Sequence, residues 1–158
     1  MLREVYENIA SNNLSQEYQK KFSDEINRFY KEIIISLKQT AENRRFVDVT
    51  RSRTLAYSGE VPMSYLMDYA LRSKDVKSDH ANIEQWPIVT DDNFEAANFL
   101  IEESREKARH FFELIEKNSV VTIGGFIGKT IDGLETTYER GGSDRSAADV
   151  AILLNENY

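Results

Sequence analysis

The sequence predicts an α/β domain with a helix-rich first third. Apolar residues recur at helical spacing between Ser15 and Leu37, which indicates a long amphipathic helix. Short apolar runs within 76–81, 88–90 and 119–123 are typical of strands, and helical patterns separate them. Short strands that alternate with helices favour a sheet covered by helices. At 158 residues the chain is expected to form a single domain.

The first third is predicted to be helical, with a break at Asn12-Asn13. From Ser15 onward, apolar side chains recur at spacings of four and three residues, which places them on one face of a helix. These residues are Tyr18, Phe22, Ile26, Phe29, Ile33 and Leu37. Charged residues fill the other face, so we expect this helix to face the core. A partner-binding coiled coil is the alternative, which aromatic residues in the stripe disfavour.

A second helical region is predicted from Ser52 to Leu71. Pro62 can lie only near its first turn, because proline lacks the amide hydrogen and clashes with the preceding turn. Glu60 stands beside a glycine just upstream of the apolar face, so we expect it at the entrance of this helix. Taken by itself, such an acid complements the positive end of the helix dipole.

Polar residues between the predicted strands are assigned to caps and surfaces. Asp91-Asp92-Asn93 is predicted to cap a helix from about Phe94 to Lys117. His80 and His110 fall in different elements, which favours packing or surface roles over metal binding. Because capping also explains the adjacent carboxylates, we assign no metal ligands.

Composition excludes several classes of protein. The net charge is -7 and no run of Lys or Arg exceeds two residues, which argues against nucleic acid as a partner. No apolar run approaches the roughly 20 residues that span a bilayer, so no membrane partner is expected. There is no cysteine, hence no disulfide framework, which fits a cytoplasmic protein.

The most informative stretch lies near the C-terminus. Gly125-Phe126-Ile127-Gly128 is followed, twelve residues later, by Arg140-Gly141-Gly142-Ser143-Asp144 and a helical pattern that runs to Leu154. A turn at Asp132-Gly133 predicts a hairpin between the two motifs. Two flexible turns, a guanidinium and a helix N-terminus suit a small anionic ligand. An ordinary turn and helix cap would explain the second motif equally well.

The order of these residues resembles the signature of the aspartokinases, which belong to the amino acid kinase family. Ser58-Gly59-Glu60 and Thr90-Asp91-Asp92-Asn93-Phe94 resemble two further aspartokinase segments, and they precede the glycine motifs as they do in that family. The resemblance covers roughly Leu55 to Leu154.

The resemblance implies a fold and an activity. The fold would be a partial amino acid kinase fold, a three-layer domain with a mostly parallel sheet, of which residues 1–158 form a single substrate-side segment and residues 1–50 a helical excursion. The activity would be ATP-dependent phosphorylation of the aspartate side-chain carboxylate in lysine, threonine and methionine biosynthesis. The parent would be a cytoplasmic homo-oligomer that binds aspartate, ATP and Mg²⁺.

The resemblance also assigns roles to residues. Glu60 would contact the ammonium group of aspartate, and Arg140 would bind a substrate carboxylate. Ser143 would hydrogen-bond the substrate, and Phe126 would form a wall of the pocket. Asp144, the catalytic residue, would orient lysines and metal-bound phosphates around the transfer.

Other family features do not occur in the sequence. A Lys-Phe-Gly-Gly loop that holds phosphates in the family is not found among the 158 residues, so the cofactor-binding residues stay unassigned and neither ATP nor Mg²⁺ is expected to bind this chain tightly. Glu139 and Arg145 stand where the family usually has a glycine and an aromatic residue, and Gly124 replaces a polar residue.

Two hypotheses of different classes follow. The chain is either an aspartokinase segment that is inactive by itself, or a stand-alone ligand-binding or interaction module that kept the amino acid site without transfer chemistry.

Overall fold

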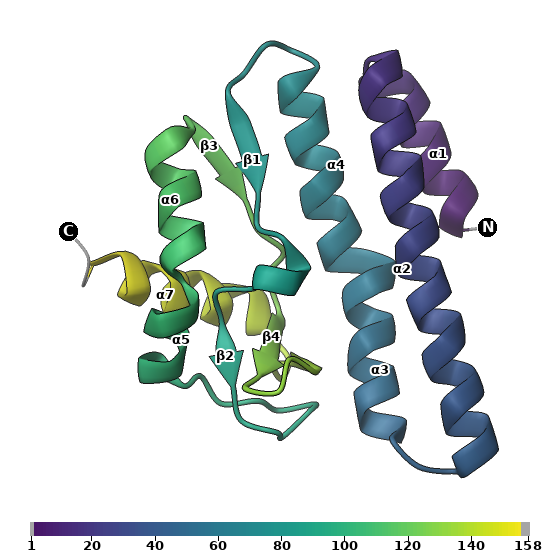
Figure 1. Cartoon of the computed structure of the whole chain (residues 1–158), viewed down its shortest axis with the longest axis vertical. Helices are drawn as coiled ribbons and strands as arrows, with labels where there is room; N and C mark the ends of the chain where they lie inside the picture. The colour runs from purple at the N-terminus through teal and green to yellow at the C-terminus, as the bar shows by residue number, and fades with distance from the viewer. Residues whose placement is uncertain (1, 156–158) are drawn as a thin grey trace.

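The computed structural model describes residues 2–155, and its helical first half lies beside a second part that contains all the strands of this range (Figure 1). Shorter helices pack around these strands. This arrangement is the mixed α/β architecture with a helix-rich first third that the sequence predicts.

The longest helix bears out most of the predicted apolar stripe. Helix α1 (Leu2–Asn13) precedes α2 (Gln16–Asn43), for which Ser15 is the N-cap. The buried residues of α2 are Phe22, Ile26, Phe29, Ile33 and Ser36. Leu37, however, is 51% exposed, so its assignment to the core was wrong. The buried face shifts to Ser36 because the facing side chain there is Arg53, whose guanidinium donates to the Ser36 hydroxyl at 2.9 Å.

The second helical region is longer than predicted and contains a π-turn. Helix α3 (Val47–Leu55), the π-helix (Ala56–Glu60) and α4 (Val61–Arg72) follow one another without a break. Pro62 lies in the first turn of α4, as predicted. Glu60 is the N-cap residue of α4 and so lies at the entrance of this helix as expected, but the π-helix precedes it directly.

The strands form two small sheets. Strand β1 (Ser78–His80) pairs in parallel with β3 (Val120–Thr122). In the other sheet, β4 (Ile127–Thr130) lies between β2 (Val89–Thr90), which is parallel to it, and β5 (Glu135–Thr137), which is antiparallel. The predicted strands and the hairpin with its turn at Asp132-Gly133 are therefore confirmed.

The predicted helix from Phe94 to Lys117 was wrong in its first part. Helices α5 (Ile101–Lys107) and α6 (Arg109–Lys117) begin only after a non-helical segment, 94–100. The Asp91 carboxylate accepts hydrogen bonds from the backbone and side-chain amides of Asn98, at 2.9 and 2.8 Å, and so closes a loop instead of capping a helix. The last helix, α7 (Gly142–Asn155), follows the second glycine motif as predicted.

One hydrophobic core joins the helical layer to the strands. The ring of Phe29 stacks on Tyr57 with centroids 5.1 Å apart and meets the edge of Tyr65 at 5.4 Å. The indole of Trp86 donates to the carbonyl of Ile127 at 2.9 Å. The first two contacts fix the π-helix and α4 against α2, and the third fixes the start of β4 against the segment that precedes β2.

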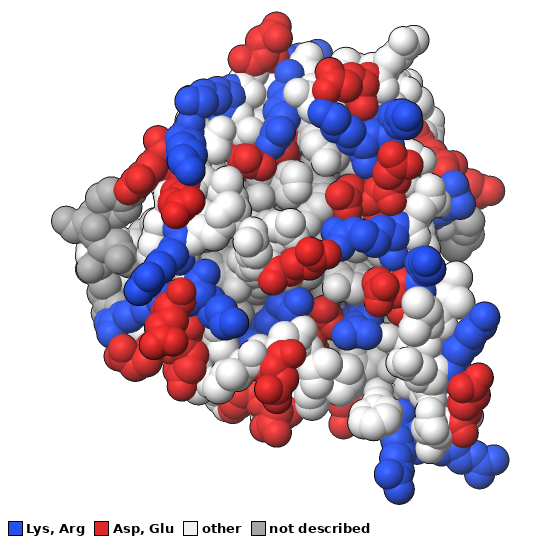
Figure 2. Space-filling view, in the orientation of Figure 1, with Lys and Arg blue, Asp and Glu red and all other residues white. Residues whose placement is uncertain are grey.

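The surface is mixed in charge. On the face seen in Figure 2, Lys and Arg side chains are interspersed with Asp and Glu. No helix within residues 2–155 is long and apolar enough to cross a membrane.

Candidate functional site

The loop after β3 brings two of the predicted site residues together. A Cβ atom on Gly124 would lie 2.9 Å from the carbonyl oxygen of Glu60, and one on Gly125 would lie 3.0 Å from the Cβ of Ser143. The backbone at 124–125 therefore passes between the π-helix and the start of α7. A side chain at Gly124 would collide with the backbone of Glu60, whereas one at Gly125 would require a small shift of Ser143.

Hollows open on both sides of this loop. One, of about 320 Å³, is lined mainly by apolar groups: Ile88, Ile123, Gly124, Gly125, Ser143, Ser146, Ala147 and Val150. The other, about 390 Å³ and more open, is lined by Glu60, Met63, Ser64, Met67, Val121, Thr122, Ile123 and Gly124. Ile123 and Gly124 line both hollows, so Ser143 lies at one hollow and Glu60 at the other, on the two sides of this loop.

Phe126 has an unusual backbone that depends on its neighbours. Its φ is 69°, in the left-handed region that costs a side chain of this size about 1–3 kcal/mol. Its amide donates to the Ser146 hydroxyl at 2.9 Å, and its carbonyl accepts from the Tyr138 amide at 3.0 Å. A Cβ on Gly142 would lie 2.7 Å from the Phe126 ring. The ring thus lies against the start of α7 and is not among the residues that line the two hollows.

Arg140 and Asp144 are exposed beside the same helix terminus. Arg140 precedes Gly141, whose φ is 83°, and Asp144 lies in the first turn of α7. Within residues 2–155, no hydrogen bond or ion pair engages either side chain. Asp144 complements the positive end of the helix dipole, and the first-turn amides of α7 favour an anion. Both side chains are available to a ligand.

The polar side chains next to the glycine motif are engaged elsewhere. The Arg145 guanidinium lies over the Tyr138 ring, 4.9 Å from its centroid, rather than beside Glu139. The Tyr138 hydroxyl donates to Asp149 at 2.6 Å, and burial together with this carboxylate raises the pKa of Tyr138. The start of α7 is therefore tied to the strand that precedes it.

A buried carboxylate links the hairpin to the helical layer. Glu135 of β5 is 2% exposed and accepts hydrogen bonds from the Arg53 guanidinium at 2.7 Å and the Tyr57 hydroxyl at 2.9 Å. The Lys129 ammonium is 3.5 Å away. Burial alone would raise the pKa of Glu135, but Arg53 and Lys129 outweigh it and hold the pKa below its usual value. Sequence reasoning missed this cluster, because β5 reads Glu-Thr-Thr, three polar residues whose burial no apolar alternation announces.

A second buried cluster surrounds Asp68, which is 0% exposed. Its carboxylate accepts from Ser78 at 2.6 Å and from Arg72 at 3.0 Å, and lies 2.7 Å from Nδ1 of His80. Burial would raise the pKa of Asp68, but these hydrogen bonds, the one with His80 foremost, lower it. His80 is held by this carboxylate and packs against the Tyr65 ring, with ring centroids 3.8 Å apart.

Metal coordination is a less suitable role for the Asp68 cluster than ion pairing. Asp68, Asp79 and His80 place potential ligand atoms within 4.8 Å of one another. However, the Arg72 guanidinium bridges the two carboxylates, at 3.0 Å from Asp68 and 2.6 Å from Asp79. This guanidinium already supplies the positive charge that a metal ion would bring.

Comparison with known proteins identifies the family. The chain matches the sequence profile of the amino acid kinase family over residues 6–157. The chain belongs to the amino acid kinase family. Within this family it is 37% identical to an aspartokinase of Rickettsia felis over 101 residues, which are 61% of the chain and 23% of that relative. It is 28% identical over 152 residues, 95% of the chain, to a bifunctional aspartokinase/homoserine dehydrogenase of Buchnera aphidicola, of which it covers 18%.

Solved structures agree with this assignment. The amino acid kinase fold of the chain superposes on E. coli aspartokinase III in complex with lysine and aspartate with a TM-score of 0.73, at 28% identity, covering 87% of this chain and 30% of that one. The same enzyme with aspartate and ADP gives 0.70 at 22% identity, over 98% of this chain and 38% of that one, which supports the fold alone. The predicted family and fold are confirmed, and the chain spans about a fifth of the length of the two curated relatives.

The predicted site residues of this amino acid kinase domain do not all lie at the glycine loop. Glu60 lies against Gly124 and Ser143 against Gly125, on the two sides of the loop that Phe126 continues. Arg140 and Asp144 lie next to Ser143 in sequence but extend from the surface. The roles of these residues toward a substrate stay predictions.

Proposed function

We propose that the chain forms the aspartate-binding side of an aspartokinase, which phosphorylates the side-chain carboxylate of aspartate with ATP. One observation carries the proposal: Glu60 and Ser143 lie on the two sides of the Gly124-Gly125 loop, which leaves little room for a side chain. Arg140 and the N-terminus of α7 adjoin Ser143 in sequence, and the Arg140 side chain has no hydrogen bond or ion pair in residues 2–155. The names of the relatives support it, as does the aspartate in the E. coli complexes.

An amino acid with two carboxylates fits these groups by charge. The Glu60 carboxylate would bind the ammonium group. Arg140 would grip one substrate carboxylate with two parallel N–H donors, a geometry that lysine cannot reproduce. The Ser143 hydroxyl and the first amides of α7 would hold the substrate from the opposite flank.

The chemical step in the whole enzyme needs no general base. A side-chain carboxylate is already ionised at neutral pH, and one of its oxygens would attack the γ-phosphorus. A new O–P bond would form as the bond to the ADP oxygen breaks, giving aspartyl phosphate and ADP. Catalysis would come from positioning and from screening two anions from each other. Mg²⁺ would contribute charge screening when bound, and the free Asp144 carboxylate offers the hard oxygen atoms that this ion prefers.

The chain by itself would not transfer phosphate at a measurable rate. Its sequence contains no Lys-Phe-Gly-Gly loop, and losing charge-stabilising donors costs several orders of magnitude in such reactions. A coupled ADP-release assay with the 158-residue chain tests this. ADP release that requires aspartate and disappears in Asp144→Ala would contradict it.

Substrate selectivity tests the proposed function itself. Calorimetric titration should detect L-aspartate and give much weaker binding of L-glutamate and N-acetylglutamate, because the longer side chain of glutamate moves its carboxylate away from the ammonium group and acetylation removes the positive charge that Glu60 would bind. Equal binding of all three, or tighter binding of glutamate, would point to another branch of the family. An upstream Lys-Phe-Gly-Gly segment in the coding sequence would separate an enzyme segment from a stand-alone binding module.

We also propose that the parent is a cytoplasmic homo-oligomer and that the chain self-associates. Large apolar side chains are exposed on α2, α3 and α4: Ile34, Leu37, Val47, Leu55, Met63 and Met67. Exposed apolar area of this extent favours association. Light scattering over a range of concentrations should therefore give a mass above 18.3 kDa, and a strictly monomeric species would contradict this.

A further inference from the structure

The π-helix that carries Glu60 depends on a donor from another part of the chain. Pro62 has no amide hydrogen, so the carbonyl of Ser58, four residues earlier, lacks its α-helical donor. The backbone instead widens into a π-turn over Ala56–Glu60, in which the Val61 amide bonds the carbonyl of Ala56. Single π-turns of this kind are frequent at functional sites.

Tyr6 of α1 supplies the missing donor. Its hydroxyl lies 3.0 Å from the carbonyl oxygen of Ser58 and 3.1 Å from that of Gly59, so a single O–H is shared between two π-helix carbonyls. The side chain is 4% exposed. Burial, assisted by the nearby Tyr30 and Glu60, raises the pKa of Tyr6 to about 12, so the hydroxyl keeps its proton near neutral pH.

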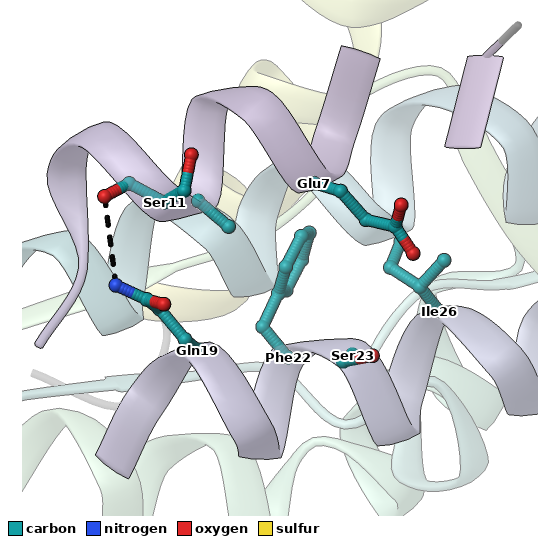
Figure 3. A pocket seen from close by; sticks show the side chains of 7 residues that line it. Glu7, Ser11, Gln19, Phe22, Ser23 and Ile26 are labelled. Atoms are coloured by element: carbon teal, nitrogen blue, oxygen red, sulfur yellow. Dashed lines mark hydrogen bonds between the residues drawn. The ribbon is translucent and has the colours of Figure 1, made fainter. Parts of the chain in front are cut away.

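Helix α1 brings Tyr6 to this position by packing on α2. The edge of the Tyr6 ring meets Phe22 with centroids 6.0 Å apart. Figure 3 shows the seam beside this contact, where Ser11 faces Gln19 across a hollow of about 200 Å³ and a hydrogen bond of 3.5 Å joins the two residues. This hollow leaves part of the interface between α1 and α2 unpacked. The hydrogen bonds from Tyr6 to the π-helix are a further, specific contact between α1 and the rest of the molecule.

The opposite side of the π-helix is limited by the glycine loop. The Gly124 backbone lies so close to Glu60 that a Cβ would come within 2.9 Å of the Glu60 carbonyl oxygen. The Glu60 side chain itself is exposed, and within residues 2–155 it has no hydrogen bond or ion pair. The place from which this side chain extends therefore depends on the backbone that Tyr6 and Gly124 contact.

We propose that Tyr6 is a positioning residue for the aspartate site: its hydroxyl fixes the π-helix so that Glu60 meets the substrate ammonium group. This inference rests on the proposed function and adds to it a residue outside every motif that resembles the aspartokinases. Tyr6 does not touch the substrate and acts only through Glu60.

The test compares Tyr6→Phe with Tyr30→Phe in the 158-residue chain. The Tyr30 hydroxyl is also buried but has no hydrogen-bond partner among the described residues, so its removal is a matched control. Tyr6→Phe should weaken L-aspartate binding about fivefold, the effect of one lost hydrogen bond, and should leave competition by succinate, which lacks the ammonium group, unchanged. Tyr30→Phe should change neither value.

A double-mutant cycle and hydrogen exchange make the result decisive. In a Glu60→Gln background, Tyr6→Phe should have no further effect on aspartate binding, because its action passes through the Glu60 carboxylate. Amide exchange at 59–61 should become faster in Tyr6→Phe and stay unchanged in Tyr30→Phe. Equal behaviour of the two variants, or equal losses for aspartate and succinate, would overturn the inference.

Failure of the proposed function would be distinguishable. If the unmodified chain binds no aspartate, the proposed function fails and Glu60 has no ammonium to meet, which overturns the positioning role. The exchange comparison would still show whether Tyr6 holds the π-helix. If the chain binds aspartate and Tyr6→Phe binds it equally well, only the inference about Tyr6 fails.

Discussion

The two flanks of the candidate site are built differently. On one flank, the backbone of Glu60 lies between the Tyr6 hydroxyl and the Gly124 loop, and the neighbouring Tyr57 bonds to buried Glu135. On the other, Arg140 is exposed and has no contact partner within residues 2–155. The flank expected to bind the ammonium group has a backbone held by distant contacts, and we call it the preformed flank; the flank of Arg140, expected to bind a carboxylate, lacks such contacts, and we call it the open flank. Both the Glu60 and the Arg140 side chains are exposed and must lose freedom on binding, at a cost in affinity.

The largest effect is expected when the buried cluster of the preformed flank is broken. Glu135→Gln leaves the Arg53 guanidinium without a counter-charge, and should lower the free energy of unfolding by about 3 kcal/mol. This is the low end for a broken buried pair, because the Arg53 side chain is still 19% exposed. Urea unfolding measures the change.

An exposed ion pair serves as the matched control for this change. Glu95 pairs with Arg51 at 2.7 Å on the surface. Glu95→Gln should cost less than about 1 kcal/mol. Similar costs for Glu95→Gln and Glu135→Gln would mean that the Glu135 cluster does not stabilise the preformed flank.

A change on the open flank, at Arg140, should lower the affinity for aspartate and leave the stability of the fold unchanged. Arg140→Lys should weaken aspartate binding by about 2 kcal/mol, because an ammonium cannot form the planar two-donor contact. The melting temperature should not change, since Arg140 makes no contact in the described structure. Calorimetry and thermal unfolding measure the two quantities, with Arg109→Lys on α6 as the control. An unchanged aspartate affinity would remove Arg140 from the site.

A smaller decrease in the free energy of unfolding is expected at low pH, and it should come from the buried clusters around Glu135 and Asp68. The pKa values of Glu135 and Asp68 are lower in the folded chain than their usual values, so the folded state favours their charged forms. Their stabilisation is complete above the unfolded-state pKa values, about 4, and is lost as the pH falls through the lower folded-state values.

Unfolding experiments at several pH values check this effect. The free energy of unfolding should be nearly constant from pH 7 to about pH 5 and should decrease below about pH 4. Glu135→Gln and Asp68→Asn should each flatten the decrease. An equally steep decrease in both variants would assign the acid sensitivity to other carboxylates.

The sequence predicts features that depend on local residues. The hairpin turn needs a glycine at a positive φ, and Gly133 provides it with 84°. The stripe along α2 is correct as far as Ile33, where α1, the π-helix and α4 cover it, and is wrong at Leu37, because Ser36 faces Arg53 instead. The segment after Asp91 was misassigned because a helix cap and a closed loop need the same carboxylate.

Contacts between distant residues were not predictable from the sequence. Tyr6 and Ser58 are separated by 52 positions, and Tyr57 and Glu135 by 78. No periodicity relates such pairs, and neither Tyr6 nor Glu135 lies in a motif. The candidate site residues Glu60 and Arg140 come from a resemblance to a family, which indicates candidate binding groups but not the contacts that hold them.

The most direct test of the account is an NMR titration of the 158-residue chain with L-aspartate, read at backbone amides. The account predicts saturable shifts at Gly124, Gly125 and Ser143, on both flanks of the loop, and their loss in Glu60→Gln and Arg140→Lys. Absence of shifts at this loop at millimolar aspartate, or shifts confined to other surfaces, would contradict the claim that these residues form an aspartate site.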